Sequence, residues 1–254
     1  TYDGTGNIIS ISDGTYTTSY AYDSANQLIR EDNQAEGRSW MWDYDDSGNI
    51  LSRTAYLYTT GILRDPIDVV EYVYGNESWG DLLTSYDGKA ITYDSIGNPL
   101  TYGNITYTWE HGRELASLSD GTTTWTYTYD ANGMRTSRSN GTFTYNYVYN
   151  GSQLIQMTEG NDTLFFTYTA SGAPATVTWN GVVYYYITNL QGDVCRIVNS
   201  SGATIATYTY DAWGNIGYVG GLMGSSLAML NPLRYRGYVY DEETQLYYLQ
   251  SRYY

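Results

Sequence analysis

One short turn motif recurs along the whole chain and constrains the fold more than any other feature. Its best copies follow the pattern Tyr-Asp-x-x-Gly-Asn, as in "YDDSGN" at residues 44–49. Well-preserved neighbours lie roughly 20 residues apart, a spacing typical of one supersecondary unit stacked on the next. Seven of the nine copies are defined by Tyr2, Asp3 and Gly6; Tyr22 and Asp23; Tyr44, Asp45 and Gly48; Tyr93, Asp94 and Gly97; Tyr129, Asp130 and Gly133; Tyr210, Asp211 and Gly214; and Tyr240 and Asp241. The other two copies are "YNGSQL" from Tyr149 and "YTASGAP" from Tyr168.

Alternating tracts such as "TWTYTYD" (residues 124–130) precede most copies. Period-two alternation of aromatic or β-branched residues predicts a strand. In the turn that follows, the aspartate can accept a hydrogen bond from the backbone two residues on, and the glycine can take the positive φ of a type I turn with a bulge. Asn26 replaces that glycine in the second copy, and asparagine also tolerates this region.

The repeat therefore predicts an all-β chain, in which antiparallel hairpins lie side by side in a curved or spiralling strip. We expect an open arc or a small barrel rather than a closed shell. Helical periodicity is nearly absent, apart from a short turn near residues 225–230. Exposed edges at the terminal hairpins would allow copies of the chain to pair through their strands.

The charge of the chain argues against two classes of partner. It has 27 acidic and 12 basic residues, with Lys89 as its single lysine, so a clustered positive face for nucleic acid or an anionic membrane is not expected. Cys195 is the only cysteine, which excludes an intrachain disulfide. The most apolar stretch, residues 217–230, is too short and too rich in Gly and Ser to span a bilayer.

Catalytic candidates are few. His111 is the only histidine, no Gly-x-Ser-x-Gly nucleophile elbow accompanies it, and "WEHGREL" resembles a variant hairpin turn. The acidic pairs Asp45 with Asp46 and Glu242 with Glu243 contain the carboxylates that a glycosidase needs. Repeated turn aspartates already have a local role, however, so we predict no catalytic residue and no cofactor.

The best metal candidate is "DYDDSG", where Asp43, Asp45 and Asp46 resemble the start of a calcium loop. The twelfth position, which needs a bidentate glutamate in an EF-hand, is Thr54. Ordinary turn chemistry explains these aspartates without an ion, and we predict no metal site.

Aromatic residues make up 17% of the chain and are the main candidates for binding. An exposed row of rings could stack on sugars or contact a protein. Packing within the sheet explains the same alternation, and we favour that interpretation. An extracellular module that binds cell-surface carbohydrate or protein stays open as the alternative.

The chain resembles the Rhs or YD-repeat proteins, which include wall-associated proteins of Gram-positive bacteria, polymorphic toxins, the C component of insecticidal toxin complexes and teneurins. The nine related copies carry this resemblance. In addition, "YYYITNLQGDVCRIVNSSGATIATYTYDAWGNI" (residues 184–216) and "NPLRYRGYVYDEETQLYYLQSRYY" (residues 231–254) resemble the Rhs-associated core segment. We expect a single domain over residues 1–254, with YD repeats at 1–183 and core-like repeats at 184–254.

This resemblance implies a β-strip that spirals into a shell enclosing a toxic C-terminal domain. It implies a non-catalytic scaffold from a larger bacterial protein, secreted or associated with the cell wall, whose partner is the C-terminal effector of that protein. In such proteins the core continues into Asp-Pro-Gly motifs that support self-cleavage, and no residue here can be assigned to that protease. Both ends of the chain look cut from something longer.

Overall fold

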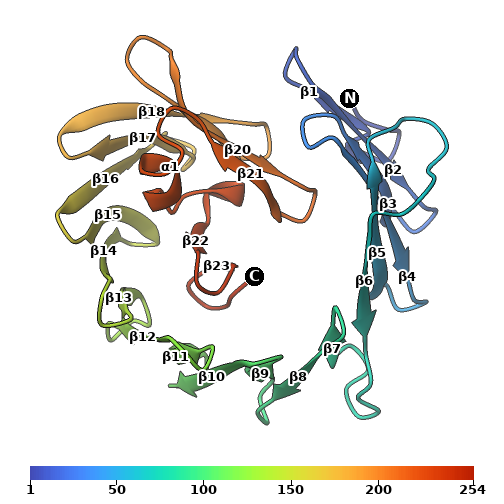
Figure 1. Ribbon diagram of the computed structural model, residues 1–254, viewed down its shortest axis with the longest axis horizontal. Helices are drawn as coiled ribbons and strands as arrows, with labels where there is room; N and C mark the ends of the chain where they lie inside the picture. The colour runs from blue at the N-terminus through green and yellow to red at the C-terminus, as the bar shows by residue number, and fades with distance from the viewer. The chain divides into compact units, whose positions relative to one another are not determined.

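The computed structural model describes residues 1–254, almost all of them in strands and turns (Figure 1). The strands are β1 (Ser10–Ser12), β2 (Thr17–Tyr22), β3 (Leu28–Asn33), β4 (Arg38–Tyr44), β5 (Ile50–Leu57), β6 (Asp68–Val73), β7 (Ser85–Tyr86), β8 (Lys89–Tyr93), β9 (Pro99–Tyr102), β10 (Ile105–Glu110), β11 (Glu114–Ser119), β12 (Thr124–Tyr129), β13 (Arg135–Ser139), β14 (Thr144–Asn150), β15 (Gln153–Glu159), β16 (Asp162–Tyr168), β17 (Pro174–Trp179), β18 (Val182–Thr188), β19 (Val194–Val198), β20 (Thr204–Tyr210), β21 (Ile216–Gly220), β22 (Val239–Asp241) and β23 (Leu246–Tyr248). The helical elements are α1 (Leu227–Leu230) and the single 3₁₀ turn η1 (Tyr235–Gly237). The prediction of an all-β fold is confirmed, and α1 is the short turn expected near residues 225–230.

Strands pair antiparallel with their neighbours in the sequence, as hairpin repeats require. Each strand from β1 to β7 pairs with the next one, and so does each strand from β9 to β19. The last two strands, β22 and β23, form a separate two-stranded sheet. None of the helices has the length and apolar composition that crossing a membrane requires.

The chain forms two compact units. The first contains Thr1–Thr92 with Thr209–Gly217, and the second contains Tyr93–Tyr208 with Tyr218–Tyr254. Each unit has its own buried cluster. These clusters are Trp40, Trp42 and Ala55 in the first unit, and Tyr107, Leu115, Leu118 and Tyr127 in the second. The expectation of one domain, divided into YD repeats at 1–183 and core-like repeats at 184–254, stays a prediction.

The motif aspartates hold the turns together, as Asp45 shows. Its Oδ1 accepts hydrogen bonds from the backbone N–H groups of Ser47 and Asn49, both at 2.9 Å, and its Oδ2 accepts one from the Asn49 side chain. Bonds from Asn49 and then Ser47 keep the pKa of the Asp45 carboxyl below its ordinary value. Gly48 has φ +90°, and the ladder shifts register between Asp43 and Tyr44. This is the geometry of a type I turn with a bulge. Equivalent backbone bonds occur at Asp3, Asp23, Asp94, Asp130 and Asp211.

Four motif tyrosines join their hairpin to the one before it. The Tyr168 hydroxyl donates a hydrogen bond of 2.7 Å to the backbone carbonyl of Leu154, which lies fourteen residues upstream. The same contact is made by Tyr22 to Ile8, Tyr44 to Leu28 and Tyr129 to Leu115, and the Trp109 indole makes it to Pro99. Sequence reasoning assigned these residues to ring packing and missed the hydroxyl. The tyrosine of the repeat is thus both a packing group and a hydrogen-bond donor between hairpins.

Replacing Tyr168 with phenylalanine should lower the free energy of unfolding by about 0.5–1.5 kcal/mol, because the half-buried Leu154 contact loses its donor while the ring is kept. Urea unfolding followed by circular dichroism measures this loss. Tyr185→Phe is the matched control, since 43% of the Tyr185 side chain is exposed and no hydrogen bond of its hydroxyl is seen. Equal losses in the two variants would contradict the role assigned to the hydroxyl.

Candidate functional site

The C-terminal segment of the second unit, residues 227–254, lies against the buried face of strands from the same unit (Figure 1, orange-red). Asn231 lies near its start and is fully buried. Its side chain accepts a hydrogen bond from the Tyr186 hydroxyl at 2.5 Å and donates one to the Tyr208 hydroxyl at 3.3 Å. Tyr208 in turn donates to the Ala228 carbonyl at 2.8 Å. These bonds fix the segment to β18 and β20.

Four charged residues form what we call the buried ion-pair cluster: Arg135, Arg138, Asp241 and Glu243. Arg135 on β13 and Asp241 on β22 pair through both ends of the carboxylate, one bond measuring 2.8 Å, and both side chains are 0% exposed. Arg138 bridges the two acids, at 3.2 Å from Asp241 and in contact with Glu243. Such bidentate pairs are the strong and geometrically specific kind.

Aromatic rings enclose the two arginines. The Arg135 guanidinium carbon lies 4.3 Å from the ring centre of Tyr248 and 5.0 Å from that of Tyr147, while that of Arg138 lies 4.1 Å from Tyr145. Cation–π attraction is strongest in desolvated sites of this kind. The Tyr127 hydroxyl donates to Glu243 at 3.0 Å, and burial together with the Glu243 charge raises the pKa of that hydroxyl. The cluster therefore holds two cations and two anions in a dry aromatic setting.

Two further ion pairs involve this segment: Arg234–Glu242 lies within it, and Arg236–Asp193, at 3.6 Å, joins it to the turn before β19. Arg234 contacts Glu242, and its guanidinium carbon lies 4.6 Å from the Tyr240 ring centre. The backbone N–H of Arg236 donates to Asp193 at 2.9 Å, which connects η1 to the turn before β19. The C-terminal segment, residues 227–254, is thus held to the strands at several points along its length.

The acidic candidates of the sequence fall into these pairs. Asp241 differs from the other motif aspartates, because its carboxylate faces Arg135 and Arg138. Glu242 pairs with Arg234 and Glu243 pairs with Arg138, so the two carboxylates do not face each other across a cleft. Sequence reasoning missed the arginines. The sequence shows only two arginines among serines and threonines in "RTSRS", and their burial on β13 is seen in the structure alone.

The remaining candidates lie in turns. His111 has φ +45° in the exposed turn between β10 and β11, and its Nδ1 lies 3.0 Å from Glu114. The Asp43 carboxylate accepts from the Ser52 hydroxyl at 2.9 Å, and both Asp45 oxygens accept bonds within the turn. The structure contains no group of three or more His, Cys, Asp or Glu residues arranged to hold a metal ion.

A second buried cluster lies in the first unit, where Thr209–Gly217 packs against β3 and β5. Glu31 is fully buried, and its two oxygens accept from the Asn33 side chain at 2.9 Å and the Ala212 N–H at 2.8 Å. The Arg53 guanidinium lies 3.2 Å from Asp211. Burial, followed by the Asp211 charge, raises the pKa of Glu31 to about 8.

Aromatic and aliphatic residues also line the exposed face of the second unit. Register places Val148 opposite Gln156, Gln156 opposite Phe165, Phe165 opposite Thr178 and Thr178 opposite Val183, so the five form one row across β14 to β18. Phe165 is 49% exposed and Val183 is 43% exposed. Most tyrosines of these strands lie on the other, buried face, as the packing interpretation expects.

Comparisons with known proteins identify the repeat. The family model described as Teneurin YD-shell matches residues 1–254. The chain is 36% identical over 240 residues to the tRNA3(Ser)-specific nuclease WapA of Bacillus spizizenii, covering 92% of this chain and 10% of that protein. It is 35% identical over 240 residues to the tRNA nuclease WapA of Bacillus subtilis strain 168, with the same coverage. The chain thus spans 10% of the length of these relatives.

Solved structures show the same fold. A crystal structure described as TcdB2-TccC3-Cdc42 matches 100% of this chain and 15% of that chain, with a TM-score of 0.67 and 16% identity. A structure described as TcdB2-TccC3-TEV matches equally well. At this identity the likeness concerns the fold alone, and together with the family match it confirms the resemblance to YD-repeat shells. The chain therefore belongs to the teneurin YD-shell family.

Proposed function

We propose that this chain is a non-catalytic wall segment of a β-shell, part of a larger bacterial protein whose C-terminal toxin or effector the shell encloses or displays. The observation that carries the proposal is the buried ion-pair cluster. The cluster binds the C-terminal segment, residues 227–254, to the buried face of the strands. This attachment makes the segment part of a rigid wall. The role is steric: the wall excludes solvent and proteases from what it surrounds.

The chemistry of the clusters supports a structural role. The carboxylates and arginines that gather in the second unit neutralise one another within a dry aromatic environment. A buried, paired carboxylate is poorly placed to transfer protons to a substrate. The relatives are named as tRNA nucleases, and we assign any such activity in the parent of this chain to a part outside these residues. A secreted or cell-wall-associated location fits the proposal.

Protease protection in the intact parent protein tests this function. The effector domain at its C-terminus should resist limited proteolysis in the parent and be digested rapidly when it is expressed alone. In a parent carrying Asp241→Ala, protection should fall, because the core-like segment loses its buried attachment. Glu110→Gln, at an exposed position of β10, should leave protection unchanged. If the effector is digested equally fast in the parent and in isolation, the shell role is wrong.

Adhesion is the second candidate, because the row of Val148, Gln156, Phe165, Thr178 and Val183 offers three exposed apolar side chains and an amide to a partner. Rings and amides on one flat face can stack on and hydrogen-bond to carbohydrate. Saturable binding to purified cell-wall glycan that disappears in Phe165→Ala would support it. Binding that is unchanged in this variant, or absent from the unaltered chain, would reject this row as the binding surface.

A further inference from the structure

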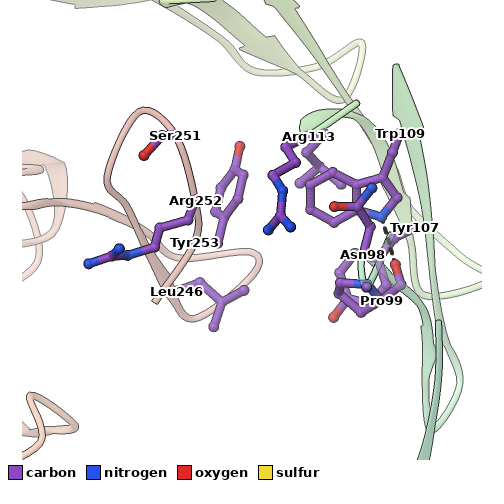
Figure 2. Close-up of a pocket in the computed structure, with 11 residues that line it drawn as sticks. Asn98, Pro99, Tyr107, Trp109, Arg113, Leu246, Ser251, Arg252 and Tyr253 are labelled. Atoms are coloured by element: carbon purple, nitrogen blue, oxygen red, sulfur yellow. Dashed lines mark hydrogen bonds between the residues drawn. The ribbon is translucent and has the colours of Figure 1, made fainter. Parts of the chain in front are cut away.

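A small pocket in the second unit lies between the strand face and the C-terminal residues (Figure 2). Its volume is about 200 Å³. One wall comes from β9, β10 and β11, and the other from residues 246–253. This space is smaller than the roughly 300–1,000 Å³ of drug-sized sites, and it suits a ligand the size of one amino-acid side chain.

Two aromatic rings that contact each other edge to face line the pocket, and hydrogen bonds hold their polar atoms in place. Trp109 and Tyr253 have ring centres 6.1 Å apart at an interplanar angle of 74°. The Trp109 indole donates to the Pro99 carbonyl at 2.6 Å, and the Tyr253 hydroxyl lies 3.0 Å from that of Tyr129. Since their polar atoms are engaged elsewhere, both rings offer apolar surface to a ligand. Leu115 and Leu246 complete the apolar lining.

The pocket also contains positive charge that no carboxylate of the chain neutralises. The Arg113 side chain lines the pocket together with Trp109 and Tyr253 (Figure 2). Arg113 belongs to none of the ion pairs of the protein, and its side chain donates one hydrogen bond, to the Ile96 carbonyl at 3.3 Å. Arg252 lines the opposite wall, is also outside these ion pairs, and points away from Arg113 (Figure 2).

Arg113 is exposed and, unlike the buried arginines of the second unit, has no carboxylate partner. Acidic residues outnumber basic ones by 27 to 12, and the buried arginines of the second unit all contact carboxylates. A guanidinium has five N–H donors in a planar fork that matches a carboxylate. Arg113 has one of these bonded to Ile96, so donors remain for a ligand at the mouth of an aromatic pocket.

We propose that this pocket binds a small organic carboxylate, with its apolar body against Trp109, Tyr253 and the two leucines and its carboxylate on Arg113. This site is independent of the shell role and would exist in either candidate function. Two sources share the required chemistry, a free aryl carboxylate and an acidic side chain of a polypeptide. The pocket selects for charge through Arg113 and for size through the two rings.

Methyl NMR of the 254-residue chain provides the test, with leucine labelling to observe Leu115 and Leu246. Phenylacetate should shift both methyl resonances in a saturable way, because its ring current acts on the pocket lining. Phenylacetamide, the neutral analogue, should bind at least about tenfold more weakly, because a charge-assisted hydrogen bond contributes on the order of 1.5–3 kcal/mol. Equal affinity for the two probes, or no shift at either leucine, would overturn the proposal.

Two variants test whether Arg113 supplies the positive charge that binds the carboxylate. Arg113→Gln should weaken phenylacetate binding about tenfold while phenylacetamide binding stays the same. Arg196→Gln removes an exposed charge from β19 of the same unit and should change neither. Circular dichroism confirms that each variant is folded. If Arg113→Gln binds phenylacetate as the unaltered chain does, the proposal is wrong.

A third probe distinguishes the two sources. N-acetylglutamate N-methylamide carries the acidic side chain of a polypeptide, and its glutamine counterpart is the neutral control. Charge-dependent binding of this probe that matches or exceeds phenylacetate assigns the pocket to polypeptide side chains. Charge-dependent binding of phenylacetate alone assigns it to free aryl carboxylates.

Discussion

Replacing Asp241 with alanine is expected to lower the free energy of unfolding by about 3–5 kcal/mol, the usual cost of leaving a buried charge without its partner. The variant removes the only carboxylate that contacts Arg135, whose side chain is 0% exposed. Arg138 keeps Glu243, so the loss concentrates at Arg135. Urea unfolding followed by circular dichroism measures the change, and hydrogen exchange should show that β22 and β23 lose protection first.

Two variants separate the charge effect from general damage. Glu110→Gln removes an exposed carboxylate from β10 of the same unit and should change stability by less than about 0.5 kcal/mol. The double variant Arg135→Met with Asp241→Leu removes both charges and should recover most of the loss, since apolar replacement of a buried pair is often neutral or stabilising. If the double variant is as unstable as Asp241→Ala, packing rather than charge explains the result.

The hairpins could be predicted because their causes are local. The Asp45 turn needs only the aspartate, the residues two and four positions on, and a glycine that accepts positive φ. Alternation within a few residues then decides which side chains share a face. All of these signals lie inside one repeat, and so the all-β fold followed from the sequence.

The candidate site could not be predicted, because its contacts join distant residues. Arg135 and Asp241 are 106 positions apart, and nothing in either neighbourhood indicates the other. Asp241 also carries the repeat motif, which suggested a local role in its own turn. Its carboxylate instead faces Arg135, because the strands place a buried arginine opposite it. The tertiary environment overrides the turn chemistry where a buried cation needs a partner.

In the first unit, the motif aspartate Asp211 combines both roles, turn capping and pairing with an arginine. Asp211 caps its own turn through Trp213 and Asn215, and it also lies 3.2 Å from the Arg53 guanidinium. Next to it the buried Glu31 carboxylate accepts a bond from Ala212. Two acids and one arginine therefore meet where Thr209–Gly217 packs against β3 and β5, and Glu36 adds a third acid nearby. The acids outnumber the arginine, and a proton on Glu31 reduces the excess negative charge.

Stability of the first unit should consequently fall as the pH rises from 4.5 to about 8. The pKa of Glu31 rises from the ordinary 4.5 to about 8 in the folded chain, chiefly through burial and then through the Asp211 charge. Below pH 4.5 both the folded and unfolded states keep the proton and the stability is complete. Between the two values the unfolded state releases its proton and the folded state does not. The free energy of unfolding then falls by about 1.4 kcal/mol per pH unit and levels off above the folded pKa.

Glu31→Gln mimics the protonated side chain and should remove this slope, so that the variant is more stable than the unaltered chain at pH 8 and not at pH 4.5. Urea unfolding at intervals across this range, followed by tryptophan fluorescence, measures the difference. Glu36 and Asp211 lie in the same cluster, and burial raises the pKa of both, so a shallow slope of equal sign should remain in the variant. Glu110→Gln is the control and should keep the full slope. A Glu31→Gln variant whose stability falls as steeply as that of the unaltered chain would show that Glu31 is not the titrating group.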